Sequence, residues 1–156
     1  MVNTNDSGAG SLRQVITNAN ALTSDASLAV SGRSAGYEHV VFMLPNGTTG
    51  SGGSLNLTGG LRSALNAFTT AGGSARVATI TPASAMTTVT SPLVIDAQTQ
   101  PGWTTRPIIE LRGSSAGAVS GLVLNADNTT LRGVIVNRFA VEGVTSTTGN
   151  AITIQG

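Results

Sequence analysis

Cysteine is absent from this chain of 156 residues. The sequence therefore has no disulfide framework and no thiolate metal site. Charged residues are scarce as well, at 10 % of the chain against about 25 % in an average soluble protein. All basic residues are arginine, they form no run, and the net charge is +1. This charge balance disfavours nucleic-acid binding through phosphate neutralisation.

Long apolar runs are missing too. No stretch approaches the roughly 20 consecutive apolar residues that cross a bilayer, so we expect no membrane span. The residues after Met1 are polar and carry no signal peptide. Polarity comes mainly from Thr, Ser, Asn and Gly, which line the outer faces and corners of β-rich extracellular proteins.

One segment has the pattern of an amphipathic helix. Ser11 and Gln14 have capping-box spacing, in which the serine hydroxyl accepts from the backbone of Gln14 and the glutamine amide reaches back. Apolar residues then recur at helical spacing: Leu12, Val15, Ile16, Ala19 and Leu22. We expect a helix over residues 11–22 that covers an open end of a sheet stack.

Short strand signals separated by turn residues fill much of the remainder. Apolar runs and alternation predict strands at residues 2–4, 39–44, 75–81, 89–96, 108–111, 121–125, 129–137, 143–146 and 150–156. The prolines lie between these segments or just before one, where β proteins tolerate them.

The last third of the chain repeats at a near-fixed interval. The interval from Gly121 to Gly143 equals the interval from Asn128 to Asn150. Strands that recur at this spacing indicate a β-solenoid, in which each coil stacks on the one before. The two asparagines would then form a side-chain ladder at a corner. Interior rows would contain Val94, Ile109, Leu122, Leu124, Val134, Val136, Ile152 and Ile154.

We expect a single domain over residues 1–156. Residues 1–45 would form an N-terminal cap of strand, helix and first strand. Residues 46–90, rich in Gly, Ser and Thr, would form an irregular excursion, and residues 91–156 the solenoid coils.

Five segments also follow one another in an order typical of one family. They are VNTNDSGAGSLRQVITNANA at 2–21, VVF at 40–42, LVIDAQTQPGW at 93–103, PIIEL at 107–111 and LRGVIVNRF at 131–139. In this order they resemble bacterial exported proteins with a right-handed parallel β-helix, which are often large surface or cell-wall-anchored proteins. The resemblance implies an all-β, right-handed parallel β-helix with a short N-terminal capping α-helix. It also implies an extracellular or cell-surface location after removal of an export signal, and it transfers no catalytic motif.

Acidic residues are the first candidates for chemistry, because parallel β-helices include polysaccharide lyases and hydrolases. Such sites need clustered carboxylates, or calcium with a basic residue. The closest acidic pair in the β region, Asp96 and Glu110, lies near Arg106 and Arg112, which favours a salt bridge or a turn-stabilising role over catalysis. The lone histidine, His39, favours a structural role. We therefore predict no catalytic residue, no metal site and no cofactor.

Trp103 and Tyr37 are the only tryptophan and tyrosine. Exposed rings of this kind stack on sugars, so both residues are candidate glycan contacts. Trp103 follows the turn at residues 100–102, which favours packing against a hydrophobic edge as its role.

Taken as a sequence, the chain predicts a non-enzymatic, extracellular structural or adhesion module. Copies that stack end to end without closing would form a filament, and surface glycans are the other expected partners. The alternative is a carbohydrate-binding or polysaccharide-degrading β-helix protein whose active residues lie in further coils. A phage or spore appendage protein with the same solenoid would differ in location only.

Overall fold

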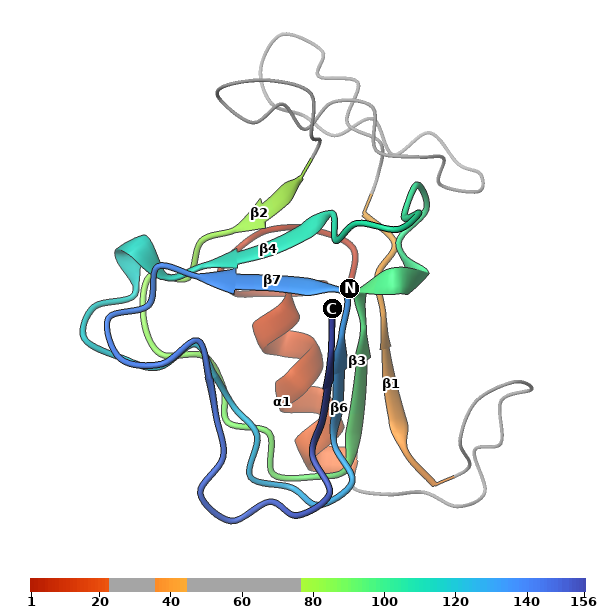
Figure 1. Cartoon of the computed structure of the whole chain (residues 1–156), viewed down its shortest axis with the longest axis vertical. Helices are drawn as coiled ribbons and strands as arrows, with labels where there is room; N and C mark the ends of the chain where they lie inside the picture. Colours follow the sequence, from red (N-terminus) through yellow and green to blue (C-terminus); the bar gives the residue numbers. More distant parts are fainter. Residues whose placement is uncertain (23–35, 45–76) are drawn as a thin grey trace, which may run out of the picture.

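A computed structural model describes residues 1–22, 36–44 and 77–156 (Figure 1). This part of the chain combines one α-helix with short parallel strands. The elements are α1 (Leu12–Leu22), β1 (Glu38–Val41), β2 (Ala78–Ile80), β3 (Leu93–Asp96), the 3-10 turn η1 (Ala97–Thr99), β4 (Ile109–Arg112), the 3-10 turn η2 (Gly113–Ser115), β5 (Leu122–Val123), β6 (Thr130–Arg132), β7 (Val134–Asn137), β8 (Val144–Thr145) and β9 (Thr153–Gln155).

The strands form three parallel sheets. The first sheet has the order β1-β3-β6-β9, the second β2-β4-β7, and the third β5-β8. A bridge between Val89 and Leu124 adds one more rung to the third sheet. Along the chain β3, β4 and β5 belong to the first, second and third sheets, and β6, β7 and β8 repeat that order before β9 returns to the first sheet.

The pairing register confirms the repeat interval. Leu122 pairs with Val144, which is the same separation as that of Gly121 and Gly143 in the sequence. In the first sheet Thr130 pairs with Thr153, a step that is longer by a single position. The separation widens earlier in the chain, where Val94 pairs with Thr130. The spacing seen in the sequence is therefore the register of the third sheet.

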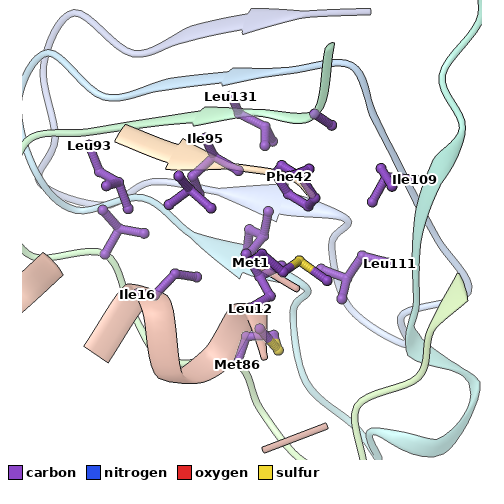
Figure 2. Close-up of a cluster of buried hydrophobic side chains, with 14 of the residues drawn as sticks. Met1, Leu12, Ile16, Phe42, Met86, Leu93, Ile95, Ile109, Leu111 and Leu131 are labelled. Atoms are coloured by element: carbon purple, nitrogen blue, oxygen red, sulfur yellow. The ribbon is translucent and has the colours of Figure 1, made fainter. Parts of the chain in front are cut away.

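One row of apolar side chains crosses all four strands of the first sheet. Val40, Ile95, Leu131 and Ile154 are successive partners across β1, β3, β6 and β9. The first three are buried, whereas Ile154 is 60 % exposed. Figure 2 shows Ile95 and Leu131 in the same cluster as Ile16 of α1.

The predicted interior positions are correct in part. Ile109, Leu122 and Leu124 are fully buried, and Val134, Val136 and Ile152 pack against the core from partly buried positions. Val94 is half-buried, because Leu93 and Ile95 on either side of it face the core. Since successive side chains of a strand alternate between faces, the predicted phase of β3 was wrong by one residue.

α1 forms where its sequence predicts, with Leu12, Ile16 and Ala19 buried and Leu22 exposed. Ser11 Oγ accepts from the backbone N–H of Gln14 at 3.2 Å, which confirms half of the predicted capping box. The reciprocal bond was predicted wrongly, because the Gln14 amide donates to Asn18 Oδ1 at 2.8 Å instead. Asn18 lies one helical turn from Gln14, a spacing at which side chains of a helix meet.

α1 is fastened to the segment between β2 and β3. Asn20 Nδ2 donates to Thr88 O at 2.7 Å, and Asn20 Oδ1 accepts from the N–H of Thr90 at 2.9 Å. These bonds fix the helix beside Val89, which is the first rung of the third sheet. In Figure 1, α1 lies inside the outline drawn by the three groups of strands and loops.

Two predicted strands take another form. Residues 2–4 form no strand, because the N–H groups of Val2 and Asn3 both approach Gly10 O and close a loop. The run at residues 129–137 divides into β6 and β7, which belong to different sheets. Gly133 between them has φ +69°, a left-handed conformation that turns the chain at a corner and that glycine adopts without strain.

Residues 46–90 were predicted to be an irregular excursion. Residues 46–76 of that range lie outside the described residues. The remainder contains β2 and the Val89 rung, whose N–H donates to Val123 O at 2.8 Å.

Candidate functional site

The two candidate glycan contacts, Tyr37 and Trp103, lie in different segments of the chain. Tyr37 is half-buried directly before β1, and Trp103 is half-buried in the turn that follows η1. The backbone N–H of Trp103 donates to Gln100 O at 3.0 Å. Its indole Nε1 is buried without a hydrogen-bond partner, so this donor does not present itself to a sugar hydroxyl in this conformation.

Asp96 and Arg132 form a salt bridge between the neighbouring strands β3 and β6. The two residues are register partners in β3 and β6, and Arg132 Nη2 donates to Asp96 Oδ2 at 2.6 Å. The other carboxylate oxygen accepts from the N–H of Gln98 at 3.1 Å and caps η1. The hydrogen bond that Arg132 donates to Asp96 raises the pKa of Arg132. Asp96 is thus occupied with Arg132, not with the Arg106 or Arg112 that its sequence position suggested.

Glu110 on β4 contacts both neighbouring strands of its sheet, β2 and β7. Thr79 Oγ1 donates to Glu110 Oε2 at 2.6 Å from β2, and Asn137 Nδ2 donates to Glu110 Oε1 at 2.9 Å from β7. Burial acts to raise the pKa of Glu110, but these hydrogen bonds and the charges of Arg112 and Arg138 outweigh it, so the pKa is lowered. A carboxylate held in its ionised form is a poor proton donor at neutral pH.

Two further acids, Asp127 and Glu142, also bond residues distant in sequence. Glu142 Oε2 accepts from Ser120 Oγ at 2.7 Å, and Asp127 Oδ1 accepts from the backbone and side-chain nitrogens of Asn150 at 2.8 and 3.1 Å. The predicted side-chain ladder between Asn128 and Asn150 is therefore wrong, because the Asn150 side chain bonds Asp127. Asn128 donates only its backbone N–H to Asn150 O, at 2.9 Å. Thr130 pairs with Thr153 in β6 and β9. Two residues before each of them, the same register places Asn128 beside Ala151, not beside Asn150.

Four of the described acids, Asp96, Glu110, Asp127 and Glu142, thus contact residues distant in sequence, whereas Asp6 forms a local salt bridge with Arg13. Within the described ranges, no group of three or more His, Cys, Asp or Glu residues could hold a metal ion. In that same part of the chain, no helix has the length and apolar character needed to cross a membrane.

Two polar residues that the sequence did not single out fasten the segment after β1. Gln100 is buried, its Oε1 accepts from the N–H of Leu44 at 2.7 Å, and its Nε2 donates to Leu44 O at 3.1 Å. Thr99 Oγ1 accepts from the N–H of Phe42 at 2.8 Å. Their side chains supply the backbone of residues 42–44 with hydrogen bonds that a neighbouring strand would otherwise provide.

The last strands of the three sheets, β7, β8 and β9, form the face that we call the open edge. Each pairs on one side with an earlier strand, and no described strand pairs on the other side. Every residue of β9 is exposed, and Val141 beside these strands is 57 % exposed. Val136, Val144 and Ile152 are only partly buried there. An unpaired strand edge with apolar side chains is a surface for strand addition.

Comparison of the chain with family models, with curated proteins and with solved structures found no match.

Proposed function

We propose that this chain is a right-handed parallel β-helix that serves as a non-enzymatic structural or adhesion module at the cell surface or outside the cell. Three features support the β-helix: parallel pairing throughout, a fixed order of sheets along the chain, and nearly equal register intervals for the last coil in the first and third sheets. Right-handedness follows the general preference of parallel crossover connections.

The observation that carries the proposed function is the use made of the carboxylates. Asp96, Glu110, Asp127 and Glu142 each contact a neighbouring coil through at least one hydrogen bond. Glycoside hydrolysis instead needs two carboxylates that flank one bond, one of them with a raised pKa. These side chains hold coils together, which is the role expected in a structural stack.

A glycan array and a panel of acidic polysaccharides test this proposal directly. The chain should bind no glycan above background and should release no reducing ends or unsaturated products. Cleavage that disappears in Glu110→Gln or Asp96→Asn, with the circular dichroism spectrum unchanged, would favour the carbohydrate-active alternative. Glycan binding lost in Trp103→Ala and Tyr37→Ala would favour the same alternative.

The location has a separate test. Protease treatment of intact source cells should remove the epitopes of an antibody raised against this chain. Full protection in intact cells, followed by digestion after lysis, would contradict a surface or extracellular site.

A further inference from the structure

Two arginines on the outer face of the second sheet surround a single carboxylate and carry more positive charge than it offsets. We propose that Arg112 and Arg138 form a docking site for the carboxylate groups of an acidic segment of a partner protein. The site rests on the structural or adhesion function proposed above, and it names the chemical class of the partner.

β4 and β7 are neighbours in the second sheet and place these residues on one face (Figure 1). Glu110 and Arg112 are the half-buried residues of β4, and they alternate with buried ones, so both lie on the outer face. Arg112 pairs with Asn137 of β7, and Arg138 follows Asn137 directly. Both arginines lower the pKa of Glu110 through their charge, which sets the two guanidinium groups around the same carboxylate.

Glu110 does not satisfy the two arginines. Its oxygens accept from Thr79 Oγ1 at 2.6 Å and from Asn137 Nδ2 at 2.9 Å. Within the described part of the chain, neither Arg112 nor Arg138 forms a salt bridge or donates a hydrogen bond. One carboxylate offsets one of the two positive charges, so the site keeps a positive charge that no neighbour matches.

Unpartnered polar atoms lie at the same place. Arg112 Nε and Asn137 Oδ1 are both buried without a hydrogen-bond partner, although their residues are register partners. Buried groups of this kind cost stability, and a bound ion or ligand beside them is one recognised explanation. The Nη atoms of Arg112 are not among the buried atoms, so they face solvent. Arg138 is exposed and has φ +57°, an unfavourable conformation that concentrates at binding sites in residues other than glycine.

The chemistry of the site favours a carboxylate carried by a peptide. A planar guanidinium fork binds a carboxylate through two parallel hydrogen bonds. A single excess charge beside Glu110 suits a monoanion better than a phosphate dianion. Ile135, the register partner of Glu110, offers an apolar contact to the aliphatic part of an acidic side chain. Sugar rings stack on aromatic platforms, but neither Trp103 nor Tyr37 lies in a strand of this sheet.

Fluorescence anisotropy with a labelled oligoglutamate peptide at low ionic strength tests the site. The natural chain should bind the peptide, and Arg112→Gln and Arg138→Gln should each weaken binding by about tenfold, since each removes a charge-assisted hydrogen bond. Arg106→Gln is the matched control, because Arg106 is exposed before β4 and does not act on the pKa of Glu110. No binding by the natural chain, or equal losses in all three variants, would overturn the proposal.

Nitrogen NMR of the arginine Nε–H groups in the natural chain provides a second readout. The oligoglutamate peptide should shift the signals of Arg112 and Arg138. The signal of Arg132, whose guanidinium already bonds Asp96, should stay in place, and so should that of Arg106. Equal shifts at all four arginines would overturn the site. If a glutamine variant fails to fold, this spectrum decides the question.

Polygalacturonate, a carboxylate-bearing polysaccharide, is the competing ligand. Binding of polygalacturonate that is tighter than that of oligoglutamate, and that is lost in Arg112→Gln, overturns the peptide class and favours the carbohydrate-active alternative. A chain that binds neither ligand and cleaves no polysaccharide keeps the structural function and loses the site. A chain that cleaves polysaccharide and still binds oligoglutamate through both arginines keeps the site and loses the structural function.

Discussion

Val40 and Ile154 stand in one row of the first sheet, yet Val40 is 1 % exposed and Ile154 is 60 % exposed. Both are β-branched apolar residues inside a parallel strand. The difference lies in what covers them, because Leu12 and Ile16 of α1 pack over the Val40 end and no described residue covers Ile154. In a row of paired strands, a residue is buried by its neighbour in the next strand as much as by residues of its own strand.

The largest expected effect comes from truncating a buried side chain of this row, with an exposed one as the comparison. Leu131→Ala should lower the free energy of unfolding by about 2–5 kcal/mol, because it leaves a cavity in a packed interior. Ile154→Ala should cost less than about 1 kcal/mol, since an exposed side chain loses little burial. Urea denaturation of the two variants at low protein concentration measures both. Similar losses would show that Ile154 is packed as closely as Leu131.

The next effect compares a buried polar contact, between Gln100 and Leu44, with an exposed side chain of β9. Gln100→Ala removes both partners of the Leu44 backbone and should cost about 1–3 kcal/mol, the usual penalty of unsatisfied buried groups. Gln155→Ala, in exposed β9, is the control and should change stability by less than about 0.5 kcal/mol. Thermal denaturation of both variants distinguishes the two cases. A neutral Gln100→Ala would mean that other groups hold residues 42–44.

Part of this organisation follows from sequence pattern alone. The apolar run of β3 and the helical spacing of α1 locate both elements, and the interval between Gly121 and Gly143 is the register of the third sheet. These features are visible because burial on one or two faces imposes a local period.

Other features depend on neighbours that the pattern does not show. Gly133 divides what reads as one strand, and the signal available was the shift in apolar phase from Leu131 to Val134. Burial of Gln100 has no such signal, because its partner Leu44 is far from it in the sequence. The exposure of Ile154 was not predictable, since its residue type suits an interior row and only the missing cover exposes it.

A pH series sharpens the role of the inter-coil carboxylates. The pKa of Glu110 is lowered in the folded chain, so its contribution to stability is present above the ordinary glutamate pKa and is lost as the pH falls through the lower folded value. The natural chain should therefore lose stability below a pH of about 4.3. Glu110→Gln should lose less over that range, as measured by urea midpoints. Parallel pH curves for the two proteins would contradict the assigned contacts.

The smallest effect concerns a corner of the last coil. Ala151 has φ +53°, and Asn128, its register neighbour in the preceding coil, has φ +56°. Alanine is disfavoured in this conformation by about 1–2 kcal/mol, whereas glycine adopts it readily. Ala151→Gly should raise the free energy of unfolding by up to about 1 kcal/mol after the entropic cost of glycine. A loss of stability would show that this corner is not left-handed in solution.

Hydrogen exchange along the first sheet tests the central claim most directly, which is that the stack is covered at the α1 end and open at the β9 end. In dilute protein the amides of β3 and β6 should exchange slowest and those of β9 fastest, because exchange follows local opening. Protection of β9 equal to that of β3 in dilute monomer, or rapid exchange in β3, would contradict this account.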